Sequence, residues 1–388
     1  MNTQAKIRIA HTLTKDPVQA ASELYHGVMQ ANIALLIFFC SNEYDRDLLA
    51  LALQRRFSDI HVVGCTTAGE IGPLGICEHS LVGISFSADT CVAVTGILKD
   101  LQQFDKTKGY TFAQELLQRL ENQVLPSYKN TFGLLLIDGL SGREELVTQI
   151  LQNVLGNVSL IGGSAGDGLN FQSTYIYFAG RFHADSAILI LLTTKLPFTV
   201  FKTQHFVPTK EWMVVTEADE PQRMVKEING LPAALEYARF IGVDVCELNP
   251  SLFAAFPVMV FINSNYYVRS IRCANADNSL TFYCAIEEGL VLHLGTGVDL
   301  VDNLESAYTK ARLQIGQPQL VLGCDCILRK LEVVEKDLLK QVENIFLSNH
   351  TAGFSTYGEQ FCGVHVNQTF AAIAIGNATE ETGNGHTH

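Results

Sequence analysis

One loop motif occurs twice in this chain, and a shorter form of it lies between the two copies. The pattern G-x-[ST]-T-x-G-E covers residues 64–70 and again residues 353–359, and the shorter form, GGSAGD, covers residues 162–167. We call these segments the first, third and second G-loop, following their order in the chain. Glycines, hydroxyl groups and one carboxylate in a fixed order, used repeatedly, indicate a duplicated structural unit that builds a site.

The segments around the G-loops repeat as well. Each loop is preceded by an apolar run (IALLIFFC, FGLLLID or LVLGC) and by a stretch with apolar residues three and four apart. These stretches (DRDLLALALQRRF, GREELVTQILQNVL and LRKLEVVEKDLLKQVENIF) predict one amphipathic helix each. An apolar segment follows each loop (SLVGISFS, SAILILLT or QTFAAIAI) and is expected to form one arm of a hairpin. The sequence therefore predicts three copies of a unit of domain scale: strand, helix, short strand, loop and hairpin.

These elements predict a mixed α/β (α+β) fold in which mixed sheets are flanked by helices. With 388 residues the chain exceeds the usual limit of one hydrophobic core. We expect one domain over residues 1–241 that holds two units, a second over 242–378, and a frayed polar tail over 379–388. Two short helices are expected near residues 220–228 and 231–241. Strands over PVMVFI, YYVRSIRCA, LTFYCAI and GLVLHLG should follow them.

Composition excludes several classes of partner. The net charge of −13 argues against nucleic-acid binding, which needs clustered Lys and Arg to neutralise phosphates. Apolar runs are of strand length, well short of the roughly 20 residues of a membrane-spanning helix. The first residues lack a signal-peptide core, and the ten cysteines are scattered without a C-x-x-C pair. A reducing, cytoplasmic location is expected.

Several motifs together resemble the FIST N-terminal and FIST C-terminal domains. They are GCTTAGEI, LIGGSAGDG, the VT…NGLPA stretch of residues 215–233, YYVRSI and GFSTYGEQ…NQT, and the resemblance runs from about residue 30 to residue 376. It implies an intracellular sensor of small ligands such as amino acids, with a FIST N-type domain over residues 1–241 and a FIST C-type domain over 242–378. The chain is similar in size to a branch of stand-alone haem proteins, called NosP, that sense nitric oxide. That similarity implies heme b and a partner histidine kinase or another two-component protein.

The G-loops carry the predicted ligand-binding residues. Loop backbone N–H groups can hold a carboxylate, and loop carboxylates can hold an ammonium group, as an amino-acid-like ligand requires. The residues are Thr66, Thr67, Glu70, Ser164, Asp167, Ser355, Thr356 and Glu359, with Arg269 of the YVRSI motif as a further carboxylate partner. The alternative is structural: hydroxyls that satisfy local backbone groups and carboxylates that pin the turns. Arg269 and Arg272 are three apart on a predicted strand and should face opposite sides, one of them meeting a carboxylate inside, such as Glu359.

A haem would need an axial histidine in an apolar pocket. His205 is the first candidate for the ligand of the haem iron, because it follows a predicted strand, lies beside Phe206 and precedes Pro208. His293 is the second candidate. One segment departs from the family pattern, since QHFVP stands at residues 204–208 where the family is usually glycine-rich. Single histidines are more often hydrogen-bonded core or surface residues, and that alternative stays open.

Two further classes of function are compatible with the sequence. A hydrolase or transferase would use Cys65, Thr66 or Ser355 as nucleophile, and would need a base brought from elsewhere in the chain, since no histidine lies beside them. A pure protein-interaction module would leave the G-loops unexplained. We expect a sensor and not an enzyme.

Overall fold

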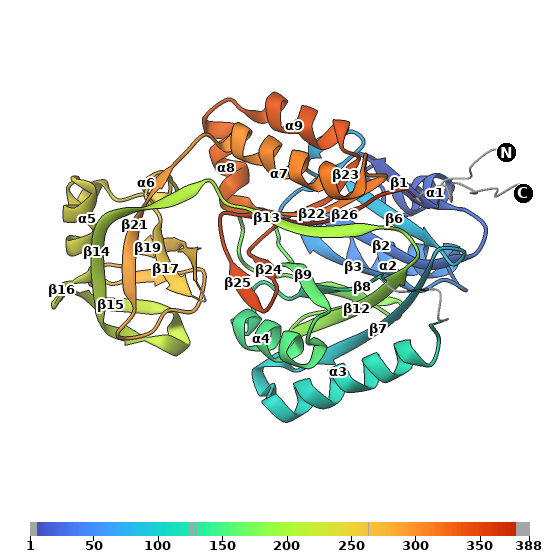
Figure 1. The fold of residues 1–388 in the computed structure, drawn as a ribbon, viewed down its shortest axis with the longest axis horizontal. Helices are drawn as coiled ribbons and strands as arrows, with labels where there is room; N and C mark the ends of the chain where they lie inside the picture. Colours follow the sequence, from blue (N-terminus) through green and yellow to red (C-terminus); the bar gives the residue numbers. More distant parts are fainter. Residues whose placement is uncertain (1–5, 125–127, 129, 263, 378–388) are drawn as a thin grey trace, which may run out of the picture.

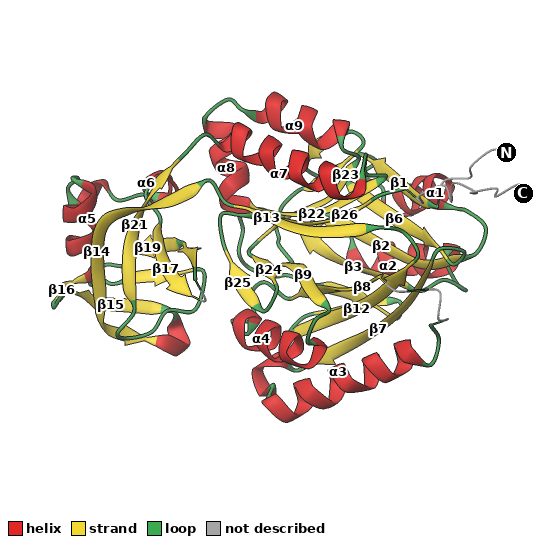
Figure 2. Cartoon of the chain, viewed as in Figure 1, coloured by secondary structure: helices red, strands yellow, loops and turns green. Residues whose placement is uncertain are grey.

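The computed structural model describes residues 6–124, 128, 130–262 and 264–377. It consists of a large body of sheets and helices and a smaller, mostly β part, the inserted domain, which comprises residues 206–297 and lies at the left of Figure 1. The helices of the body lie outside its sheets, as Figure 2 shows. The predicted class, mixed sheets flanked by helices, is confirmed. The predicted tail at residues 379–388 lies outside the described residues.

The body is built from three units that share an order of elements: strand, helix, strand, helix, strand, hairpin and strand. In the third unit, two consecutive helices occupy the position of the second helix. The first unit contains β1 (Ile7–Thr12), α1 (Pro17–Val28), β2 (Ile33–Ser41), α2 (Arg46–Arg56), β3 (Val62–Thr67), β4 (Glu70–Gly72), β5 (Gly75–Cys77) and β6 (Leu81–Ser87). The second contains β7 (Cys91–Lys99), α3 (Lys106–Glu121), β8 (Asn130–Ile137), α4 (Glu144–Leu155), β9 (Ser159–Ser164), β10 (Ile176–Phe178), β11 (Arg181–His183) and β12 (Ser186–Thr194).

The third unit is interrupted by the inserted domain. It contains β13 (Phe198–Thr203), α7 (Leu300–Ile315), β22 (Leu320–Cys326), α8 (Ile327–Glu335), α9 (Leu339–Ser348), β23 (Thr351–Thr356), β24 (Glu359–Phe361), β25 (Val364–Val366) and β26 (Phe370–Ile375). The inserted domain contains β14 (Phe206–Asp219), β15 (Met224–Ile228), β16 (Leu231–Pro232), α5 (Ala233–Ile241), α6 (Pro250–Ala255), β17 (Val258–Ile262), β18 (Asn265–Arg269), β19 (Ile271–Ala274), β20 (Leu280–Phe282) and β21 (Val291–Gly297). The predicted division of the chain after residue 241 stays a prediction.

The three units exchange their hairpins in a cycle. Hairpin β4–β5 of the first unit pairs with β23 of the third, β10–β11 of the second pairs with β3 of the first, and β24–β25 of the third pairs with β9 of the second. Each unit therefore completes the sheet of another, in the strand orders β1-β6-β2-β3-β10-β11, β25-β24-β9-β8-β12-β7 and β13-β26-β22-β23-β4-β5. Side chains from all three sheets form one core, in which Phe39 and Phe354 stack at 4.5 Å.

Local chemistry explains where the elements begin. The central strands β2, β8 and β22 are buried apolar runs, as expected for strands covered on both faces. The carboxylates of Asp16 and Asp45 accept hydrogen bonds from backbone N–H groups three residues on, and so cap α1 and α2. Because β2 and β3 run parallel, as do the other two pairs, all three G-loops leave their sheets at the same kind of strand end.

Four sequence predictions differ from the structure. The stretch LRKLEVVEKDLLKQVENIF forms two helices, α8 and α9, because Asp337 adopts a left-handed backbone with φ of 54°. The helix expected near residues 220–228 is mainly strand β15, in which Val225 and Ile228 are buried. YYVRSIRCA forms two strands, β18 and β19, instead of one. Finally, the apolar segments after the G-loops are not hairpin arms: β6, β12 and β26 each lie between two strands of their own sheet.

Candidate functional site

The three G-loops meet at the centre of the body. Each loop donates a backbone hydrogen bond to the strand end of another unit, which closes a ring. These bonds run from Ala68 N–H to Ser355 O (2.9 Å), from Gly166 N–H to Thr66 O (3.0 Å) and from Tyr357 N–H to Ser164 O (3.2 Å). The ring fixes the loops to one another, so a ligand at this point would contact more than one unit.

A glutamate closes the first and third G-loops in the same way. Each accepts a hydrogen bond from the threonine three residues earlier, and from the N–H and hydroxyl groups of a residue ten positions later. The two sets are Thr67, Glu70 and Ser80, and Thr356, Glu359 and Thr369. Both carboxylates are thus used inside the fold, as the structural alternative predicts.

Burial raises the pKa of both glutamates, to about 7 for Glu70 and about 8 for Glu359. Between the ordinary pKa near 4.5 and these values, the folded chain keeps protons that the unfolded chain releases. The free energy of unfolding therefore falls as pH rises through this window. We expect Glu359→Gln to make the free energy of unfolding less dependent on pH. At pH 8 the variant should be more stable than the unsubstituted chain by at least about 2 kcal/mol.

Urea unfolding at a series of pH values between 5 and 9 measures this effect. Glu335→Gln, at an exposed position at the end of α8, is the matched control and should leave the profile unchanged. A Glu359→Gln profile parallel to that of the unsubstituted chain would show that Glu359 does not titrate in this window.

The second G-loop is closed differently. The carboxylate of Asp167 accepts hydrogen bonds from the N–H groups of Phe171 (2.8 Å), Gln172 (2.9 Å) and Ser173 (2.8 Å), and from the hydroxyl of Tyr357. Asp167 therefore organises the longer segment that leads from β9 to β10, and its oxygens are already occupied.

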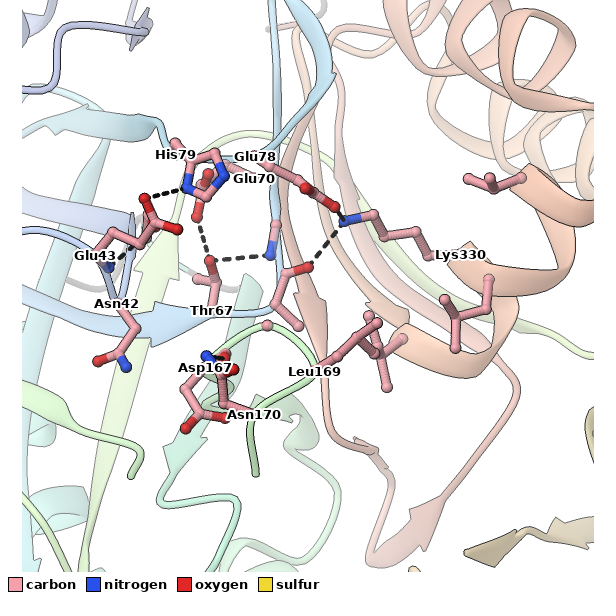
Figure 3. Close-up of a pocket in the computed structure, with 17 residues that line it drawn as sticks. Asn42, Glu43, Thr67, Glu70, Glu78, His79, Asp167, Leu169, Asn170 and Lys330 are labelled. Carbon is pink, nitrogen blue, oxygen red and sulfur yellow. Dashed lines mark hydrogen bonds and ion pairs between the residues drawn. The ribbon is translucent and has the colours of Figure 1, made fainter. Parts of the chain in front are cut away.

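A cavity of about 340 Å³ opens where the first two G-loops face α8. We call it the loop pocket. Its lining comes from residues 41–43 after β2, residues 67–70, the β5–β6 turn at residues 78–79, residues 167–170, and Ile327, Lys330, Leu331 and Val334 of α8. Figure 3 shows Lys330 reaching from α8 toward the first G-loop, with Glu78 and His79 above it and Leu169 and Asn170 on the opposite side. Segments of all three units thus build one site.

Lys330 is the central charge of the loop pocket. Its ammonium group donates hydrogen bonds to the carbonyl of Ala68 (3.0 Å) and to Glu78 Oε1 (2.7 Å). The bond to Lys330 and the nearby positive charge lower the pKa of Glu78. Gly69 makes this approach possible: its φ of +134° suits glycine, and a Cβ there would lie 2.7 Å from Lys330 Nζ. The close approach of Lys330 therefore explains why the motif has a glycine at residue 69.

The rest of the loop pocket combines charge with apolar surface. Glu43 and His79 are in contact at its rim, with 2.6 Å between Glu43 Oε2 and His79 Nδ1, and both side chains are exposed. Leu169 and Val334 are 59% and 56% exposed, so two large apolar side chains line the pocket in contact with solvent. A small molecule that carries both charges and an apolar group would match all of these features.

The predicted ligand-binding residues divide into two groups. Thr67, Glu70 and Asp167 line the loop pocket. The others lie outside that lining: Thr66, Ser164, Ser355, Thr356, Glu359 and Arg269. Arg269 and Arg272 do face opposite sides, since Arg269 is buried and Arg272 is exposed. The guanidinium of Arg269 donates to the carbonyl of His365 (3.1 Å), and the expected partner Glu359 is instead held by threonines.

His205 lies between β13 and β14, where the chain enters the inserted domain. Its Nε2 is 2.9 and 3.0 Å from the two carboxylate oxygens of Glu332, and its buried Nδ1 has no hydrogen-bond partner among the described residues. That donor arrangement suits a ligating histidine, but the ring is 0% exposed and packs against Phe206 at 4.2 Å. The packing therefore does not fit a haem at His205 unless the connection moves. His293 is half-buried, packed edge-on to Tyr266.

The proposed nucleophiles are deeply buried. Cys65 is 0% exposed, and burial raises its pKa well above the usual value, which disfavours a reactive thiolate. The Ser355 hydroxyl is buried without a hydrogen-bond partner in the described part of the chain. Within those same residues, no group of three or more His, Cys, Asp and Glu side chains could hold a metal ion.

Sequence reasoning missed the residues that α8 and the β5–β6 turn contribute. Lys330 stands in an amphipathic stretch, where a lysine is normally expected to be solvated. Its burial depends on the packing of α8 against a loop more than 250 positions away. The Gly69 position of the motif was the only local signal for it.

Two family models match this chain. The FIST N domain matches residues 34–231, and the FIST C domain matches residues 233–362. No curated protein sequence gives a significant match. Among the described helices, none has both the length and the apolar character needed to cross a bilayer. The chain therefore belongs to the FIST family, whose domains are sensor domains of signal transduction.

Proposed function

We propose that this protein is a sensor that binds a small zwitterionic, amino-acid-like molecule in the loop pocket. The observation that carries the proposal is the pocket itself: about 340 Å³, built by all three units, with a buried lysine, rim carboxylates and exposed apolar side chains. The carboxylate of the ligand would meet Lys330, its ammonium group would meet Glu43 or Glu78, and its apolar group would cover Leu169 and Val334.

The helix α8 offers a route from the loop pocket to the inserted domain. Lys330 lines the pocket, while Glu332, two residues along, holds His205 at the entry to the inserted domain. The carbonyl of His205 also accepts a hydrogen bond from Val298 N–H (2.7 Å), just after β21, where the chain returns to the body. A ligand that draws Lys330 away from Glu78 would shift α8 and, through Glu332, both connections. In this proposal the inserted domain presents the change to a partner such as a histidine kinase.

We expect L-leucine, used as the first probe, to raise the melting temperature of the protein progressively as its concentration increases above the dissociation constant. Lys330→Met should weaken leucine binding at least tenfold, because a charge-assisted hydrogen bond to the carboxylate is lost. Isothermal titration calorimetry measures the dissociation constant of leucine for the variant and for the unsubstituted protein. Lys340→Met, an exposed position on α9 outside the pocket lining, is the matched control and should bind as the unsubstituted protein does.

Leucine analogues sharpen the same test. N-acetyl-leucine lacks the ammonium group and leucinamide lacks the carboxylate, so both should bind more weakly than leucine. Equal binding of leucine by Lys330→Met and the unsubstituted protein would refute this site. Failure of all common amino acids to bind would refute the ligand class.

A haem-based version, with heme b and nitric oxide as the signal, is a narrower proposal: at His205 it requires the connection between β13 and β14 to move, and His293 is the other candidate ligand. Its support is the unpartnered Nδ1 atom that each of the two histidines buries. An absorption spectrum after addition of hemin tests it. We expect a Soret band at one haem per chain, and this band should be lost in His205→Ala or in His293→Ala. If no such band forms, or if both variants keep it, the haem proposal fails.

A further inference from the structure

A second cavity, of about 270 Å³, lies between the body and the inserted domain. We call it the interdomain cavity. The body contributes Gly139, Leu140, Gly142, Phe171 and Tyr357, and the inserted domain contributes residues 221–223, Arg272 and residues 281–283. It shares no lining residue with the loop pocket. Cavities at domain boundaries are common ligand sites.

The interdomain cavity is free of acidic side chains, although the chain has a net charge of −13. It contains two arginines. Arg223 is neutralised by Glu144 (2.6 Å) and Glu145 (2.7 Å), which lie behind it and outside the lining. Arg272 is exposed and forms no ion pair within the described part of the chain. The cavity therefore presents one uncompensated guanidinium.

Aromatic rings form a continuous wall beside that guanidinium. Phe171 stacks on Tyr357 with 4.5 Å between ring centroids and lies 5.7 Å from Tyr283. The guanidinium of Arg272 lies over the Phe171 ring at 5.7 Å. The hydroxyl of Tyr357 is already bonded to Asp167 and to the carbonyl of Gly168, so the wall offers ring surface and not a hydroxyl from this residue.

We propose that the interdomain cavity binds a small aromatic carboxylate. Arg272 forms a bidentate ion pair with the carboxylate, and the ring of the ligand packs against the wall of Phe171, Tyr283 and Tyr357. Open space at Gly142, where an added Cβ would have no atom within 4 Å, leaves room at the body side. The ligand contacts the body and the inserted domain together, so its binding restrains their relative position. This site shares no lining residue with the loop pocket, and the inference does not rest on the amino-acid proposal.

Fluorine NMR with 4-fluorobenzoate as the probe tests the proposal on the full chain. Binding should broaden the fluorine signal, and neutral 4-fluorobenzamide should bind at least tenfold more weakly. Arg272→Gln should weaken 4-fluorobenzoate binding at least tenfold, whereas Arg272→Lys should retain part of it. Arg239→Gln, at an exposed arginine of the same domain that pairs with Glu236 outside the cavity, is the matched control.

The variant Lys330→Met distinguishes binding in the interdomain cavity from binding in the loop pocket. If the probe binds in the interdomain cavity, Lys330→Met binds it normally, whatever happens to leucine. Three results overturn the proposal: no binding by the unsubstituted protein at millimolar probe, equal binding by Arg272→Gln, or loss of binding in Lys330→Met alone. Circular dichroism of Arg272→Gln confirms that the exposed substitution leaves the fold intact.

Discussion

Gly353→Ala is expected to abolish stable folding of the body, with a loss of at least about 3 kcal/mol in the free energy of unfolding. Gly353 is the first glycine of the third G-loop, and it pairs with Gly323 across the parallel strands β22 and β23. A Cβ at residue 353 would lie 1.8 Å from the carbonyl oxygen of Gly323. No side-chain rotation relieves a contact with backbone, so the two central strands would have to separate.

Urea unfolding followed by circular dichroism measures the loss. Gly297→Ala is the control, because a Cβ there would meet its nearest atom, in Phe206, at an ordinary 3.6 Å. The control should stay within about 1 kcal/mol of the unsubstituted chain, the usual cost of a substitution that fits its site. A Gly353→Ala protein as stable as the control would mean that β22 and β23 are not paired as described.

Asp325→Ala should cost about 3–5 kcal/mol, because it leaves the guanidinium of Arg329 buried and unpaired. Arg329 is 0% exposed, and its Nε donates to Asp325 Oδ1 at 2.8 Å. Its two terminal nitrogens are also buried without hydrogen-bond partners among the described residues. Burial raises the pKa of Asp325 to about 6, so the ion pair weakens in mildly acidic solution.

The double variant Asp325→Ala with Arg329→Met removes both charges and should recover most of the loss. Thermal unfolding at pH 7.5 compares the single, double and unsubstituted chains. A loss below about 1 kcal/mol in Asp325→Ala would show that Arg329 finds another partner or reaches water, as exposed pairs do.

Much of the fold was predictable from local pattern. Apolar runs such as IALLIFFC identified the central strands, and three-and-four spacing identified α2 and α4. The mistakes came where tertiary packing decides between structures. Val225 and Ile228 are three positions apart, a spacing that fits one face of a helix, and only pairing of β15 with β14 and β20 selects the strand.

The functional site was predictable only in part. The G-loop motif identified Thr67, Glu70 and Asp167, which line the loop pocket. Lys330 could not be found this way, because nothing local distinguishes a lysine whose ammonium group meets a distant carbonyl from one that faces water. The same holds for Arg272, whose guanidinium lies over Phe171, a residue of the segment after the second G-loop.

Local sequence patterns were enough to identify the repeated unit, because strand and helix periodicity and glycine-dependent loops are local properties of the chain. Tertiary structure alone decided that each unit lends its hairpin to another, that the loops close into a ring, and that α8 covers the first loop. Those arrangements depend on which buried surfaces fit together and on which backbone groups pair across hundreds of residues. A sequence pattern shows which face of each segment can be buried, but the segment that covers this face is determined only by tertiary packing.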